Sequence, residues 1–243
     1  PHATTGRGLP PALRARRHVL PGRGRQDRSR AQERPAHDHQ RPEQAHVQPG
    51  LGRLKDTDED PANSSNIIEL YTGRSEPKSD NGGNPASGTA STSGPSPTAT
   101  SARPPAPGTD IHHLRPSDVQ VNSTRGNKDF DNGGTELSDA PGNYTDSDSF
   151  EPRDAVKGDV ARMILYMAVR YEGDDAFPPD LEPNDSVSNG SSPHIGRLSV
   201  LKAWSEQDPP DTFEKRRNDV IYEDYQHNRN PFVDHPEWVE AIW

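Results

Sequence analysis

Residues 109–127 read TDIHHLRPSDVQVNSTRGN, and this stretch says more about the fold than any other part of the chain. The Pro-Ser-Asp triplet within it predicts a turn that begins a helix, with Ser117 or Asp118 as the N-cap. Side chains of these types accept hydrogen bonds from the first free backbone N–H groups of a helix. Val119 and Val121 would then face inward.

The same stretch gathers side chains that carry chemistry, namely His112, His113, Arg115, Arg125 and Asn127. Imidazoles move protons, guanidiniums neutralise charge developing on a phosphate, and a carboxamide oxygen is a good ligand for a hard cation such as Mg²⁺. We expect Arg125 and Asn127 to project from the last helical turn, at the end where the histidines lie. From spacing alone, a helix end rich in Asn and Gly with solvated histidines is the favoured interpretation.

The composition limits how much of the chain can fold. Of 243 residues only 27% are hydrophobic, and there are 26 prolines and 20 glycines. Such a chain cannot bury a core along its whole length, so order must be concentrated in part of it. The lack of cysteine excludes disulfides and thiolate metal sites such as a zinc ribbon. No apolar run is long enough to span a membrane.

Charge is distributed unevenly along the chain. The formal net charge of −10 argues weakly against a general polyanion binder. Residues 7–53 are nevertheless strongly basic, and a basic arm for nucleic acid is one interpretation of them. The N-terminal Pro1-His2-Ala3 has neither an initiator Met nor an apolar signal core, so we expect either a missing start or a lost leader.

Changes in composition divide the chain into segments. Residues 1–53 are predicted to be a disordered or out-of-frame segment, and residues 86–107 a linker-like or out-of-frame segment, both of low order. Residues 54–85 and 108–243 are then the N-terminal and C-terminal parts of one domain.

Periodicity predicts a largely helical C-terminal half. An apolar stripe at three- and four-residue spacing predicts a helix over residues 154–171. Further helices are predicted over 197–206, from Asp211 as N-cap, and in the tail at 238–243, whereas 66–71 predicts a short strand. The expected fold class is α+β, predominantly helical, with a small β-hairpin that supports the chemical groups.

Several longer motifs are specific enough to indicate a family. They are HHLRP with VNSTRGN in 112–127, the stretch 66–84, KGDVAR at 157–162, and NRNPF with DHPEW in 228–238. Together they resemble the endonuclease I family, bacterial secreted and periplasmic nucleases that cut DNA and RNA with a ββα-metal site. The resemblance covers most of residues 54–85 and 108–243.

This resemblance implies a metal-dependent endonuclease, a hydrolase of the ββα-metal (His-Me finger) type. In the family a Glu and an Asn hold Mg²⁺ or another divalent cation, and the His beside that Glu is the general base. The Asn corresponds to Asn127, the expected metal ligand. Arg125 matches the family's Arg and is expected near the phosphate, and with His112 and His113 it makes up the expected catalytic residues. The resemblance further implies a DNA and/or RNA substrate, a secreted or periplasmic monomer, and no membrane partner.

The family's Glu-His pair is missing from this chain. It belongs to a motif Arg-Glu-His-Val-Trp-Pro that should follow Gly-Gly-Asn-Pro at 82–85, where Ser, Thr, Pro and Ala stand instead. If the codons for residues 87–99 are read in a frame shifted by one base, the bases fixed by the observed residues permit a different sequence. At positions 88–97 it would be Trp, then Asp or Asn, then Arg-Glu-His-Val-Trp-Pro-Lys-Ser. We therefore predict that residues 1–53 and about 86–107 are out-of-frame translation of a nuclease gene. This polypeptide should then be inactive or nearly so.

Other interpretations stay open. Residues 86–107 could be a real linker insertion, and the chain a non-catalytic secreted nucleic-acid-binding protein with a basic N-terminal arm. A salt-sensitive DNA affinity that disappears on deleting residues 1–53 would favour that alternative. A third interpretation is an acidic helical domain with no nucleic-acid role.

Single residues elsewhere give weaker signals. The alternating aspartates at 56–60 resemble a calcium loop, but Pro61 stands where that loop needs Gly, so a solvated acidic turn is expected. Arg162 is predicted to form a surface salt bridge and His235 to be structural. The tryptophans are predicted to lie in the core.

Overall fold

The structure of the chain is a computed structural model that describes residues 51–80, 88–92, 107–173, 180–187, 189 and 193–243. Within these ranges the chain is a mixed α+β domain, which confirms the predicted class. None of the helices described is both long enough and apolar enough to cross a membrane.

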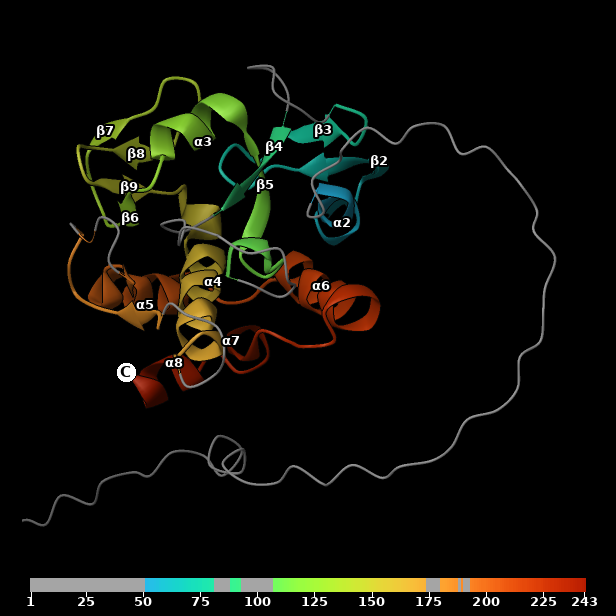
Figure 1. Ribbon diagram of the computed structural model, residues 1–243. Coiled ribbons are helices and arrows are strands. Elements are labelled where there is room, and N and C mark those ends of the chain that lie inside the picture. Colours follow the sequence, from blue (N-terminus) through green and yellow to red (C-terminus); the bar gives the residue numbers. More distant parts are fainter. Residues whose placement is uncertain (1–50, 81–87, 93–106, 174–179, 188, 190–192) are drawn as a thin grey trace, which may run out of the picture. The chain divides into compact units, whose positions relative to one another are not determined.

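The helices gather around α4 (Lys157–Arg170), which lies at the centre of the helical layer (Figure 1). It packs against α5 (Leu198–Gln207) and against α7 (Pro231–Asp234). These helices confirm the predictions over 154–171 and 197–206. The remaining helical elements are α2 (Leu51–Thr57), α3 (Val119–Arg125), α6 (Thr212–Val220), a π-helical turn η4 (Ile221–Tyr225), α8 (Trp238–Ile242), and the short turns η2 (Pro107–Thr109) and η3 (Asp154–Val156).

Helix α4 is buried on all sides and not only along its apolar stripe. Every residue from Lys157 to Ala168 is buried, including charged ones. Gly158 shows how closely the helix is approached, because a Cβ there would lie 1.8 Å from the backbone oxygen of Asp208. The Gly158 N–H donates to the Asp208 carboxylate over 2.9 Å. A glycine is therefore required where the end of α5 meets the start of α4.

The strands of the described residues form several small sheets. One is the antiparallel meander β1 (Glu59–Asp60), β2 (Asn63–Ile68) and β3 (Ser75–Pro77). A second has the order β6-β9-β8-β7, made of Asp129–Phe130, Ser149–Glu151, Tyr144–Thr145 and Thr135–Glu136. Two-stranded pairs are β4 (Gly88–Thr92) with β5 (Leu114–Asp118), and β10 (Glu182–Pro183) with β11 (His194–Ile195). Strand structure is thus more widespread than the single hairpin that the sequence predicted.

An aromatic cluster joins the β6-β9-β8-β7 sheet to α5. The rings of Phe130 and Phe150 lie 6.4 Å apart, Tyr71 lies 5.0 Å from Phe150, and Trp204 lies 6.3 Å from Phe130. Trp204 is 1% exposed, so its predicted core position is confirmed. The other two tryptophans, in the C-terminal tail, are half-buried.

Of the two segments predicted to have low order, 1–53 and 86–107, the structure describes only residues 51–53, 88–92 and 107, so the prediction stays open. Helix α2 begins at Leu51, and β4 forms a strand within 86–107. Strand β4 is possible there because ladder bonds join backbone groups, whatever the side chains are. The rest of both segments lies outside the described residues. The predicted strand at 66–71 is also displaced, since β2 ends at Ile68 and Leu70 is buried beyond it.

Candidate active site

Strands β4 and β5 and helix α3 follow one another as strand, strand and helix, and α3 packs against both strands. The predicted N-cap is confirmed, because Asp118 accepts from the backbone N–H groups of Gln120 and Val121 over 2.8 and 3.1 Å. Its other oxygen accepts from Arg74. Val121 is buried as predicted, at 1% exposed. The sharp passage from β5 into α3 is therefore fixed by one side chain.

The end of α3 is held by Arg125, whose side chain is fully buried. Its guanidinium donates to the backbone oxygens of Gly126 (3.0 Å) and Lys128 (3.2 Å) and lies over the ring of Phe130 at 5.1 Å. These contacts support the backbone on both sides of Asn127, which is exposed. The guanidinium thus faces the protein in this structure, and the phosphate contact expected of it stays a prediction.

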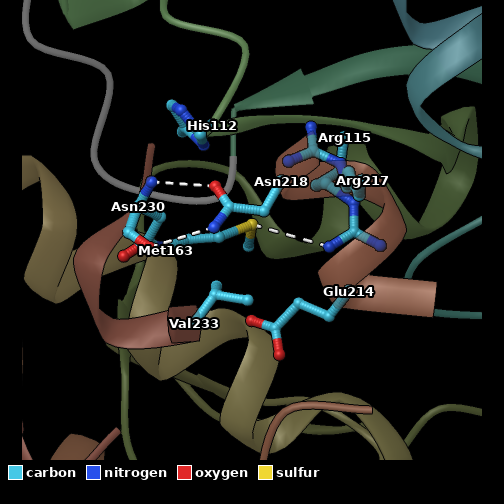
Figure 2. Close-up of a pocket in the computed structure, with 8 residues that line it drawn as sticks. All are labelled: His112, Arg115, Met163, Glu214, Arg217, Asn218, Asn230 and Val233. Atoms are coloured by element: carbon cyan, nitrogen blue, oxygen red, sulfur yellow. Dashed lines mark hydrogen bonds between the residues drawn. The ribbon is translucent and has the colours of Figure 1, made fainter. Parts of the chain in front are cut away.

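His112 is buried next to a small polar cavity. Its Nε2 lies 3.1 Å from the backbone oxygen of Asn228, and its ring lies 4.6 Å from that of Tyr166. Burial lowers the pKa of His112 to about 4, so the imidazole is neutral near pH 7. Figure 2 shows His112, Asn218 and Asn230 around this cavity. The Asn218 carboxamide accepts from the backbone N–H of Asn230 over 2.8 Å and donates to its backbone oxygen over 3.1 Å. The cavity has room for roughly one water molecule.

His113 is buried as well, at 2% exposed. Burial, and then the nearby positive charge of Arg125, lower its pKa to about 4. Its Nδ1 has no hydrogen-bond partner among the described residues. Both histidines thus lie just before the start of β5, and neither is open to solvent, so the solvated histidines that spacing alone favoured are not what the structure shows. Their catalytic roles stay predictions.

The turn that carries the two histidines is fixed by Arg217 of α6. Its Nη2 donates to the backbone oxygens of Ile111 and of Leu114, the latter over 2.7 Å. Its Nε lies 3.2 Å from the carboxylate of Asp58, which also accepts from Arg115 over 2.7 Å. The prediction of a solvated turn at Asp58 is therefore wrong, since this carboxylate is buried between two guanidiniums.

A second buried carboxylate, Asp110, supports the same turn. It accepts from the hydroxyls of Tyr166 and Tyr171, each over 2.9 Å, from the Gln226 carboxamide over 3.0 Å, and from the backbone N–H of His112 over 2.9 Å. These four hydrogen bonds offset much of the free energy that the carboxylate loses when it is removed from water. The residues before β5 are thereby tied to α4 and to the segment after α6.

Arg162 belongs to this buried network and not to the surface, so its predicted surface salt bridge is wrong. Its side chain is 0% exposed, and Nη2 lies 2.6 Å from Glu214. Asp159 pairs with Arg162 at 3.6 Å and with Arg115 at 3.2 Å. Burial, followed by the negative charge of Asp159, raises the pKa of Glu214 to about 7. Sequence reasoning missed the pairs of Arg162 with Glu214 and of Arg115 with Asp159 because their partners lie 52 and 44 residues apart in the chain.

A divalent cation does not find a complete site among these residues. Mg²⁺ takes oxygen ligands in near-octahedral geometry, usually with one or two carboxylates. Asn127 supplies a single carboxamide. The described part of the chain contains no cluster of three or more His, Asp or Glu side chains suited to a metal. The residues present therefore do not fit the metal that the sequence resemblance implies.

The family profile of endonuclease I matches residues 52–237, which include the whole of β5, α3 and the buried network. The chain belongs to the endonuclease I family. It is 63% identical over 195 residues to the extracellular ribonuclease of Bacillus amyloliquefaciens, a match that covers 78% of this chain and 65% of the relative. It is 61% identical over 190 residues to the extracellular ribonuclease of Bacillus subtilis (strain 168), covering 78% and 66%. The chain thus spans about two thirds of the length of these relatives.

Two of the motifs by which the sequence resembles the endonuclease I family coincide with the buried polar contacts. In the KGDVAR motif, Asp159 and Arg162 belong to the network, and Gly158 allows the approach of the chain after α5. In the NRNPF motif, Asn228 holds His112, and Asn230 caps α7 by accepting from the N–H of Phe232. These residues organise the scaffold of the candidate site.

Proposed function

We propose that this endonuclease I domain descends from an enzyme that hydrolyses phosphodiester bonds of RNA and/or DNA with a divalent cation, and that this chain itself is inactive or nearly so. One observation carries the proposal. Strand β4 pairs antiparallel with β5 ahead of α3, an order that a ββα site would also have, and Ser91 and Thr92 stand at the positions where the shifted reading frame permits Glu and His.

Loss of those two side chains removes both a charged ligand and a base. A carboxylate oxygen binds a hard cation far better than a serine hydroxyl does. An imidazole with an ordinary pKa takes up a proton near neutral pH, whereas a threonine hydroxyl does not. His112 and His113 do not replace it, because both are buried and their pKa values are lowered to about 4.

Substrate and location follow from the relatives. Both curated relatives are named extracellular ribonuclease, which supports RNA as a substrate class and secretion as the location of the intact protein. A DNA substrate, a Mg²⁺ cofactor and a monomeric state rest on the family resemblance.

The coding DNA tests the origin of β4 directly. A shifted frame with Glu at position 91 and His at position 92 requires GCG for Ala90 and AGC for Ser91. A serine codon of the TCN type at Ser91 would end the frameshift proposal and leave a true insertion as the explanation.

A pair of substitutions tests the functional proposal in the full chain. The double variant Ser91→Glu/Thr92→His, and a second variant with Trp-Asn-Arg-Glu-His-Val-Trp-Pro-Lys-Ser at positions 88–97, should gain plasmid nicking and RNA cleavage that EDTA abolishes. The matched control Ser91→Gln/Thr92→Asn keeps similar size and polarity but lacks the charge and the base, and it should stay inactive. Adding Asn127→Ala to the restored chain should remove the gain.

Two outcomes would contradict the proposal. EDTA-sensitive cleavage by the unmodified chain would show that it already holds a complete site. A restored ten-residue variant that folds, as judged by circular dichroism, but cleaves neither RNA nor DNA would show that the loss of Glu and His is not what separates this chain from an active nuclease.

A further inference from the structure

The turn between β6 and β7 holds an Asn-Gly pair that the proposed nuclease chemistry does not use, Asn132-Gly133. Both residues are exposed, and a Cβ added to Gly133 would meet nothing within 4 Å. In such pairs the glycine nitrogen can attack the side-chain carbonyl carbon of the asparagine, since no side chain blocks its approach. We propose that Asn132 is a structure-assisted deamidation site, at which Trp204 and Glu151 promote conversion of the asparagine to aspartate and isoaspartate.

Trp204 supplies a hydrogen-bond donor to the reacting carbonyl. Its indole Nε1–H donates to the side-chain oxygen of Asn132 over 2.8 Å. The indole is held firmly, because it is 1% exposed, packs 6.3 Å from the ring of Phe130 and has the ammonium of Lys157 at 5.7 Å from its ring. A fixed donor at this oxygen stabilises the negative charge that develops there when the nitrogen adds to the carbon.

Glu151 of β9 supplies an acceptor for the proton of the attacking nitrogen. One of its carboxylate oxygens accepts from the backbone N–H of Gly133, and the other accepts from Lys157 over 2.6 Å. Lys157 therefore fixes the orientation of the carboxylate. The next residue, Gly134, has a φ of +98° and lies so close to the backbone of Thr145 that a Cβ would approach it to 2.4 Å. The backbone of the turn is thus fixed, and the Glu151 carboxylate contacts the N–H of Gly133 that would lose its proton.

The proposed reaction consumes only water. As the Gly133 nitrogen bonds to the side-chain carbon of Asn132, its proton passes to the Glu151 carboxylate. The bond from that carbon to the side-chain nitrogen then breaks, the proton moves to the leaving nitrogen, and ammonia departs. Water opens the resulting succinimide to aspartate or isoaspartate at position 132. The isoaspartate product lengthens the main chain between β6 and β7.

The chain contains its own reference sites. Asn-Gly occurs also at Asn81-Gly82 and Asn189-Gly190. Intrinsic reactivity is shared by all such pairs, so a rate difference between them in one sample reports the surroundings and not the motif. A synthetic peptide of residues 128–137 gives the rate of the Asn132 pair without the fold.

The test is timed incubation of the full chain at neutral pH, followed by peptide mapping with mass spectrometry and enzymatic labelling of isoaspartate. We expect the deamidation rate at Asn132 to exceed the rate in the peptide, and the rates at the two reference pairs, by about tenfold. This is less than the rate enhancement that a general base gives in an enzyme, because a carboxylate is a weak base toward an amide. A rate at Asn132 equal to or below that of the peptide would overturn the proposal.

Variants separate the two assisting groups from general stability. Glu151→Gln and Trp204→Phe should each bring the rate at Asn132 down toward that of the peptide. Glu136→Gln is the matched control, because the Glu136 carboxylate likewise accepts from a glycine N–H, that of Gly142 over 2.8 Å, but no asparagine precedes that glycine. Equal rates in the Glu151→Gln and Glu136→Gln variants, with near-UV circular dichroism unchanged in both, would contradict the assignment of Glu151.

Discussion

The buried histidines should each contribute a loss of stability as pH falls, and His113 allows one such contribution to be isolated. Burial lowers the pKa of His113 to about 4 in the folded chain, against 6.5 as its ordinary value. The unfolded chain therefore binds the proton first, and stability is lost as pH falls from the unfolded pKa toward the folded one. Between about pH 7 and about pH 5 the loss from this residue is about 2 kcal/mol.

The variant His113→Met removes the titrating group. It leaves no hydrogen bond to Nδ1 broken, since that atom has no partner among the described residues. Urea unfolding followed by tryptophan fluorescence would give the unfolding free energy of both proteins at the two pH values. The variant should lose about 2 kcal/mol less than the unmodified chain on acidification.

The comparison between proteins is essential because other buried groups act in the opposite direction. Burial raises the pKa of Glu214 to about 7 and that of Asp129 to about 6. For these carboxyls the folded chain binds the proton first, so their contributions make stability rise as pH falls through the same window. Both proteins contain these carboxyls, so their contributions cancel when the unfolding free energies of the two proteins are subtracted. His235→Gln, at an exposed site, is the control and should leave the loss unchanged. An equal acid loss in His113→Met and the unmodified chain would refute the reasoning.

Two further predictions concern packing and buried charge. Gly158→Ala should cost about 1–3 kcal/mol of unfolding free energy, because a Cβ there would overlap a backbone oxygen. The control Gly52→Ala lies in α2 with open space around it, and it should stabilise the chain by about 0.5–1 kcal/mol. A Gly158 variant as stable as its Gly52 counterpart in urea unfolding would contradict the close approach. Arg162→Met should cost about 3–5 kcal/mol of unfolding free energy, because it leaves Glu214 buried without its cation. Arg229→Met removes a partly exposed pair with Asp234 and should cost less than about 1 kcal/mol. Equal costs of the two arginine variants, measured by thermal and urea unfolding, would show that burial does not distinguish the pairs.

Local patterns in the sequence were sufficient for the helices and their starts. Asp118 and Asp211 cap α3 and α6 as predicted, because a capping side chain contacts backbone only two or three residues away. Helix α4 was predicted from the spacing of its apolar residues, which is a local property as well. Family membership was also readable, since HHLRP and the other motifs are contiguous strings. That residues 86–107 contain neither Glu nor His is likewise a property of the sequence.

The tertiary structure alone decided which polar groups are buried and what they contact. Asp58 was predicted to be solvated, yet it lies between Arg115 and Arg217, which are 57 and 159 residues away. The guanidinium of Arg125 donates to the backbone oxygens on both sides of Asn127, a contact that the sequence did not predict. A charged side chain leaves water only where distant segments bring it counter-charges and hydrogen-bond partners together. That condition depends on the packing of the whole chain, so no local pattern expresses it.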